Sequence, residues 1–166
     1  MKRILYWLLA LALVVSVFPL TAWGAESETS DQGDEGVIVH EETILQSDGS
    51  VLEIRVVAYP SRVGHYQDGS ITYTYRNTSG VAQWAATLSA TFYYNGSISS
   101  CTTASLSITF NNNHFYKVSG GASWSGNTAT ANYTIGYKSL GVTIGTTAYS
   151  LTLSCDKDGH LSGSYT

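Results

Sequence analysis

The chain has 166 residues, of which 43% are hydrophobic and 12% charged, and its formal net charge at pH 7 is -4. This length and apolar content are sufficient for one ordinary globular domain. The few basic residues form no stripe or cluster, so the composition argues against a nucleic-acid partner.

The first 24 residues have the order of a secretory signal peptide. Lys2 and Arg3 precede an apolar run over residues 4–20, and the small-residue stretch TAWGA follows. Ala22 and Gly24 fit the −3 and −1 positions of a cleavage site after Gly24. We therefore expect a secreted, extracellular protein without membrane contact after cleavage. The alternative is an uncleaved anchor, because the run is at the lower limit for spanning a bilayer.

Residues 25–36 are acidic and low in apolar residues. Seven acids and no Lys or Arg occur from Glu26 to Glu42. This composition predicts a disordered, solvated leader, with calcium binding or wall spacing as the alternative roles. We expect a single domain over residues 37–166.

After Gly36 the sequence alternates with period two, which indicates β-strands. In VLEIRVVAY, over residues 51–59, the apolar residues Leu52, Ile54 and Val56 share one face. In VAQWAATLSATFYYN, over residues 81–95, Trp84 shares its face with Leu88 and Phe92. This second run is longer than a typical strand, so we expect it to lie inside a sheet with Trp84 in the core.

Further alternating runs start at Ala104, Ala129 and Tyr149, and turn residues separate the runs. Dipeptides that tolerate positive φ predict hairpins at Asp48-Gly49, Asp68-Gly69, Asn95-Gly96, Gly126-Asn127 and Asp158-Gly159. Eight or nine strands joined mostly by hairpins favour a two-layer antiparallel β-sandwich. A small closed β-barrel is the alternative.

The chain has two cysteines, Cys101 and Cys155. An even number of cysteines in an exported chain favours one disulfide over a metal site or a catalytic thiol. Such a bridge would contribute about 3 to 4 kcal/mol of stability in the chain-entropy treatment.

Asp156, Asp158 and His160 alternate near the end of the sequence and are weak candidates for a metal site. A calcium loop of the EF-hand type needs oxygen ligands at positions 1, 3 and 5, glycine at 6 and glutamate at 12. Here the glycine directly follows Asp158, His160 offers no oxygen, and no late glutamate is present. We therefore predict a polar turn and no metal.

Catalytic constellations are not evident in the sequence. The four histidines show no paired spacing, and Glu53 has no evident second carboxylate for glycoside hydrolysis. We expect neither an enzyme nor a cofactor.

Aromatic residues are the main candidates for binding. Tyr93 lies opposite Phe92 in the alternation, Tyr116 adjoins another aromatic, and Trp124 lies two residues before a predicted turn. Rings with a polar group can stack on sugars or become buried at a protein interface. We therefore select Trp124, Tyr93 and Tyr116, with general strand packing as the alternative role.

Residues 71–162 contain the strings QWAATLSATFYYNG, CTTAS, SGNTATA and LTLSCDKDGHLS. These strings give the chain a resemblance to an uncharacterised group of small secreted all-β proteins of Gram-positive bacteria. The resemblance implies secretion, an all-β domain and pairing of Cys101 with Cys155, and it brings no established activity.

Our first hypothesis is therefore a secreted, non-enzymatic β-sandwich that acts by binding or structural contact outside the cell. A carbohydrate- or cell-wall-binding module is the second, and an exported bacteriocin-like effector is the third. The partner would be a glycan or a cell-surface protein.

Overall fold

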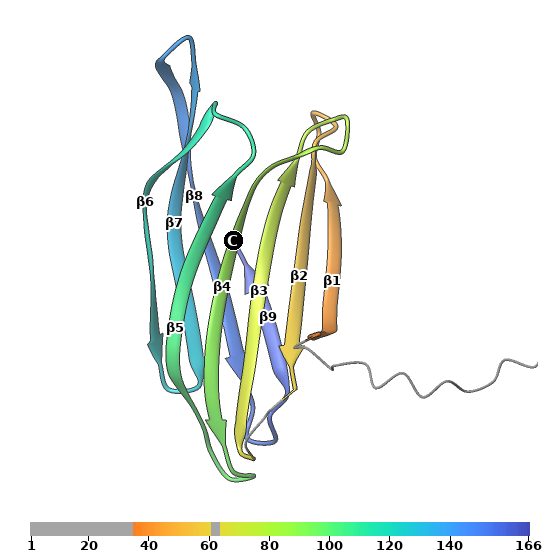
Figure 1. Cartoon of the computed structure of the whole chain (residues 1–166), viewed down its shortest axis with the longest axis vertical. Coiled ribbons are helices and arrows are strands. Elements are labelled where there is room, and N and C mark those ends of the chain that lie inside the picture. The colour runs from red at the N-terminus through yellow and green to blue at the C-terminus, as the bar shows by residue number, and fades with distance from the viewer. Residues whose placement is uncertain (1–34, 61–63) are drawn as a thin grey trace, which may run out of the picture. The chain divides into compact units, whose positions relative to one another are not determined.

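The computed structural model describes residues 35–60 and 64–166, and Figure 1 shows their arrangement. The predicted signal peptide and most of the acidic leader lie outside the described residues. The chain from Gly33 to Thr166 forms one compact unit. Within the described part, no helix is long and apolar enough to cross a membrane.

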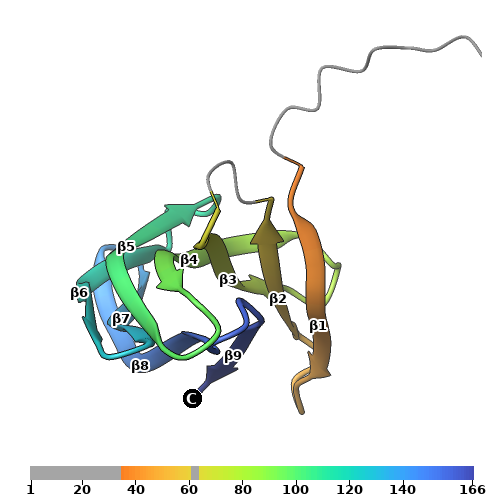
Figure 2. The ribbon, with the colours of Figure 1, turned by 90° about the horizontal axis from the view of Figure 1, so that it is seen from below.

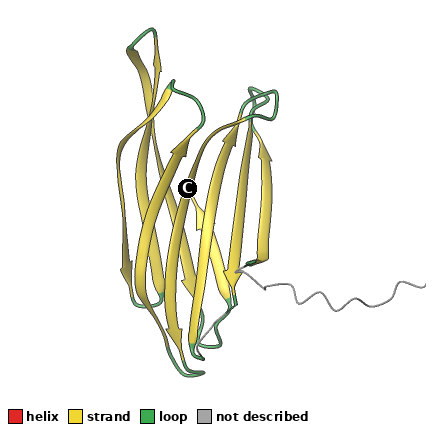
Figure 3. Ribbon diagram, in the orientation of Figure 1, coloured by secondary structure: helices red, strands yellow, loops and turns green. Residues whose placement is uncertain are grey.

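The described residues form nine strands and no helix (Figure 3). The strands are β1 (Val37–Leu45), β2 (Val51–Tyr59), β3 (Tyr66–Arg76), β4 (Ala82–Tyr94), β5 (Ser99–Phe110), β6 (Phe115–Ser125), β7 (Thr128–Ser139), β8 (Val142–Cys155) and β9 (Leu161–Tyr165).

Two antiparallel sheets face each other, with strand orders β1-β2-β3-β4-β5 and β6-β7-β8-β9. The end-on view of Figure 2 shows the two layers. The described strands do not close into a barrel, so the predicted all-β, two-sheet architecture is confirmed and the alternative is not observed.

The core lies between the sheets and follows the predicted alternation. Ile54, Val56, Trp84, Leu88 and Phe92 are all buried, and they face buried residues of β7 and β8. Strand β4 pairs with β3 on one side and β5 on the other, as expected for a long strand inside a sheet.

The prediction of a turn at Asp68-Gly69 is wrong, because both residues lie within β3. Gly69 pairs with Ala58 and Ala90, and the side chain of Leu161 occupies the space that a Cβ at this position would need. The glycine therefore permits close approach of β9 to the other sheet and does not mark a reversal of the chain.

The other four predicted turns join consecutive strands, as expected. The predicted turns do not include the hairpin between β3 and β4, over residues 77–81, or the hairpin at Leu140-Gly141. The second joins β7 and β8, and both of its turn residues have positive φ. This hairpin extends beyond the other strands at one end of the sandwich (Figure 1).

Candidate functional site

The three aromatic residues selected from the sequence lie on different surfaces. Tyr93 pairs with Tyr66 on the outer face of the five-stranded sheet, where their ring centroids are 5.5 Å apart. Tyr116 covers Gly136 on the outer face of the other sheet. Trp124 is 50% exposed near the far end of β6. The three rings therefore form no common platform.

Asp156 organises the turn between β8 and β9. Its Oδ1 accepts hydrogen bonds from the backbone N–H groups of Asp158 and His160, both at 2.9 Å, and its Oδ2 lies 3.0 Å from His160 Nδ1. Asp158 pairs instead with Lys157, with 2.6 Å between Oδ2 and Nζ. Among the described residues, no group of three or more Cys, His, Asp or Glu is placed to hold a metal ion.

Removal of the Asp156 carboxylate is expected to destabilise this turn, whereas calcium is expected to leave the midpoint of thermal unfolding almost unchanged. The His160 backbone N–H, followed by its side chain, lowers the pKa of Asp156 to about 2 from 3.8. The stabilisation of the folded turn by the ionised Asp156 carboxylate is therefore complete above pH 3.8, and it is lost as the pH falls through about 2. Melting curves of the protein and of Asp156→Ala, with calcium or a chelator, would test this. A large, chelator-reversible rise with calcium would contradict it.

The structure differs from the sequence prediction at the two cysteines, which are buried free thiols. Each thiol donates to a main-chain carbonyl near it in the chain: Cys101 Sγ to Thr103 O at 3.2 Å, and Cys155 Sγ to Asp156 O at 3.5 Å. Burial raises the pKa of both thiols, and the neighbouring Cys155 raises that of Cys101 further.

A cleft at one end of the sandwich is the strongest candidate site. It consists of two hollows of about 310 and 370 Å³ that share Tyr75, Phe115 and Tyr137. We call it the end cleft. It opens where β3 and β7 end and where β4, β6 and β8 begin.

The aromatic residues of the end cleft continue a cluster that begins in the core. The Trp84 ring lies 6.1 Å from that of Tyr75, and Phe115 lies 5.7 Å from Tyr75 and 5.3 Å from Tyr137 between ring centroids. Rings that pack on one another in this way lose little conformational entropy when a ligand binds, so they form a preorganised apolar wall.

Uncharged polar groups form the rim of the end cleft. Asn112 Nδ2 donates to Gln83 Oε1 at 2.6 Å, and Gln83 in turn donates to the Val81 carbonyl at 2.8 Å. His114 Nδ1 lies 3.0 Å from the Lys138 carbonyl. The remaining polar residues, apart from the tyrosines, are Asn77, Thr146 and Thr147. These groups are held in place and supply both donors and acceptors.

The end cleft lacks the groups needed for acid-base catalysis with carboxylates. Its lining, as far as the structure describes it, contains no Asp or Glu. Burial raises the pKa of Tyr149, so its hydroxyl remains neutral near physiological pH. Glu53, the carboxylate considered from the sequence, is paired with Arg55 at 3.3 Å and with Arg76 at 2.8 Å.

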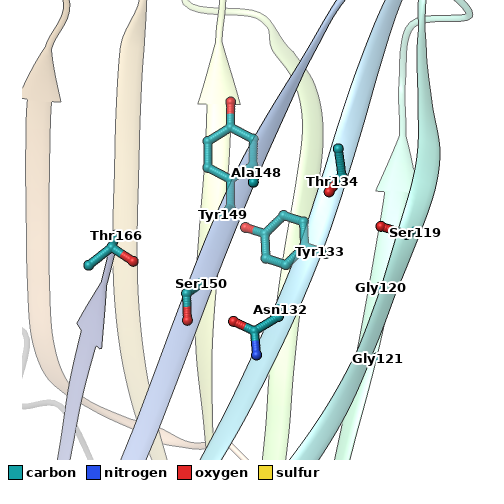
Figure 4. A pocket seen from close by; sticks show the side chains of 10 residues that line it. All are labelled: Ser119, Gly120, Gly121, Asn132, Tyr133, Thr134, Ala148, Tyr149, Ser150 and Thr166. Atoms are coloured by element: carbon teal, nitrogen blue, oxygen red, sulfur yellow. The ribbon is translucent and has the colours of Figure 1, made fainter.

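A third hollow, of about 500 Å³, lies on the four-stranded sheet in addition to the two that form the end cleft (Figure 4). It is lined by small polar and glycine residues together with two tyrosines, Tyr133 and Tyr149, whose rings pack with Trp84 between the sheets. This hollow offers hydroxyl and amide groups, whereas Tyr133 is only 2% exposed and Tyr149 is half-buried. The lining residues are Ser119, Gly120, Gly121, Asn132, Tyr133, Thr134, Ala148, Tyr149, Ser150 and Thr166.

Sequence reasoning missed the end cleft, because its residues come from five strands and two turns. The string NNNHFY, over residues 111–116, was the available signal: amides and a histidine directly before an aromatic pair. By itself, this string is typical of a polar loop that enters a strand.

Comparison with known proteins adds no assignment: no family model, no curated protein and no solved structure matches the chain.

Proposed function

We propose that the protein is an exported, non-enzymatic binding module whose end cleft holds a neutral saccharide. The observation that carries this proposal is the composition of the cleft, which combines the aromatic rings of Tyr75, Phe115 and Tyr137 with uncharged amide and imidazole groups.

This combination matches the chemistry of a sugar ring. The C–H groups of a pyranose form an apolar face that packs on aromatic rings, and its hydroxyls both donate and accept hydrogen bonds. The side-chain amides of Asn77 and Asn112 supply complementary donors and acceptors, while the buried Gln83 holds Asn112 in place. The lack of a carboxylate in the described lining favours a neutral sugar that is retained without hydrolysis.

Export and a disulfide are part of the same proposal. The sequence of residues 1–24 supports secretion, and an oxidising environment would join Cys101 to Cys155. The backbone N–H of Cys101 donates to Gly126 O, and that of Cys155 donates to Asn127 O. The two cysteines therefore flank the same turn.

Replacement of Tyr137 by alanine is expected to weaken saccharide binding by about tenfold or more, because an aromatic anchor at the centre of a site commonly contributes that much. The test is a pull-down of the protein on insoluble neutral polysaccharides and purified bacterial cell wall. Tyr137 is partly exposed, so its truncation leaves the core intact.

Trp124→Ala is the matched control, because Trp124 is an exposed aromatic outside the cleft. We expect this variant to be retained as well as the parent protein. Loss of retention in Trp124→Ala but not in Tyr137→Ala would place the site elsewhere. No retention of the parent protein on any polysaccharide would contradict the proposal.

A further inference from the structure

The tip of the β7–β8 hairpin exposes a set of aliphatic side chains. Leu140 is 99% exposed, Val142 63% and Ile144 64%. The hairpin extends past the ends of the neighbouring strands (Figure 1), so the described part of the protein does not cover its tip. Scattered exposed aliphatics are normal, but three within five residues at a protruding tip form an apolar patch.

Leu140 also occupies a backbone conformation that disfavours it. Its φ is +50° and that of Gly141 is +80°, the pattern of a two-residue turn with positive φ at both positions. Asn-Gly and Asp-Gly are the residue pairs that such turns prefer, since a branched side chain is strained at positive φ. The sequence thus retains an aliphatic residue where both solvent exposure and backbone geometry oppose it, which points to a functional role.

A polar and aromatic collar lies directly behind the tip. Lys138 Nζ lies 5.8 Å from the ring centroid of Tyr116, and the Tyr116 hydroxyl lies 2.7 Å from Thr143 Oγ1. Tyr137, which precedes Lys138 in β7, is also exposed. An aliphatic tip followed by tyrosine and lysine matches the order of groups at a membrane interface, where aromatic rings and long basic side chains lie at the level of the headgroups.

The charge of this part of the chain favours an anionic partner. No Asp or Glu occurs between Asp68 and Asp156, a stretch that includes Arg76, Lys117 and Lys138. Asp48, which lies in the β1–β2 turn, is at the edge of the other sheet (Figure 1). Arg76 is paired with Glu53 at 2.8 Å, so the positive charge next to the apolar tip is that of Lys138. No acid lies on β4 to β8 to oppose it.

We propose that the β7–β8 hairpin inserts its tip into the interfacial region of an anionic lipid bilayer. Leu140, Val142 and Ile144 enter the acyl boundary, and Lys138 contacts the headgroups. This proposal replaces the expectation, drawn from the sequence, that the domain has no membrane contact once the signal segment is removed. Tyr137 and Ile144 also line the end cleft, but vesicles without sugar test this proposal separately from the saccharide site.

The test uses the compact unit from Gly33 to Thr166, which contains the whole core and omits the apolar N-terminal run. Its binding is measured by co-sedimentation with vesicles of phosphatidylcholine containing phosphatidylglycerol, and with phosphatidylcholine alone. We expect the protein to bind the anionic vesicles. Its binding should be weaker to the neutral vesicles, and weaker to the anionic vesicles at high salt.

Leu140→Asn is the decisive variant, because asparagine suits the turn while it removes the aliphatic tip. We expect its partition onto anionic vesicles to fall about tenfold, while its melting temperature stays equal or rises. Ile98→Asn is the matched control: Ile98 is also exposed, in the β4–β5 turn at the opposite end (Figure 1). Equal binding of Leu140→Asn and the parent protein, or no binding of the parent to anionic vesicles, would overturn the proposal.

Discussion

Replacement of Trp84 by alanine is expected to lower the free energy of unfolding by about 3 to 5 kcal/mol, the range typical of a buried aromatic residue truncated to alanine. Trp84 is 1% exposed. Its ring centroid lies 5.5 Å from that of Tyr73 and 5.2 Å from that of Tyr149, so it joins the inner faces of both sheets. The vacated space cannot be filled by these rings without loss of their mutual packing.

Urea denaturation followed by circular dichroism would measure this difference. Trp124→Ala is the matched control, because it makes the same chemical change at an exposed position and is expected to alter the stability by at most about 0.5 kcal/mol. Equal effects of the two substitutions would show that the core is not centred on Trp84. Since Trp84 also lines the end cleft, Trp84→Ala should weaken saccharide binding even where the protein remains folded.

The sequence predicts the core well because a strand buried on one face must alternate. In β4 the inward positions of Trp84, Leu88 and Phe92 are all fully buried, as the period of two requires. The turn at Asp158-Gly159 was equally predictable, since its glycine has a φ of +91° and Asp156 caps the adjacent N–H groups.

Two local features were not predictable because contacts distant in the sequence determine them. Gly69 has the same local signature as a turn glycine, but it lies in β3 because Leu161 packs where its side chain would be. Conversely, Leu140 carries no turn signal and yet adopts positive φ, because pairing of β7 with β8 imposes the reversal there.

The end cleft was not predictable for a related reason. Its polar rim depends on Gln83, whose position on β4 gives no hint of a contact with Asn112, 29 residues later. The alternation correctly places Gln83 on the face opposite Trp84, yet the residue is buried, because Asn112 covers it from the β5–β6 turn. Local periodicity indicates which face a side chain takes, whereas the partners it meets depend on the packing of the sheets.

Oxidation of the cysteine pair is expected to raise the free energy of unfolding by about 3 to 4 kcal/mol, because a bridge from β5 to the end of β8 closes a long loop in the unfolded chain. Both backbone N–H groups bind carbonyls of the Gly126-Asn127 turn, so the two residues are already adjacent. For the bond to form, each sulfur must leave its carbonyl, at Thr103 or Asp156. The two thiols then give two electrons and two protons to an oxidising thiol–disulfide couple.

Thiol titration of the unfolded protein from an exporting host, followed by denaturation with and without a reductant, would test this bridge. We expect no free thiol and a reductant-dependent loss of stability. In Cys101→Ser and in Cys155→Ser the reductant should have no effect on the monomer, because no intramolecular bond remains to be broken. Two free thiols in the exported protein would mean that the hydrogen bonds to Thr103 and Asp156 persist outside the cell. Burial, which raises the pKa of both thiols and so suppresses the reactive thiolate, would then be the physical reason that the pair stays reduced.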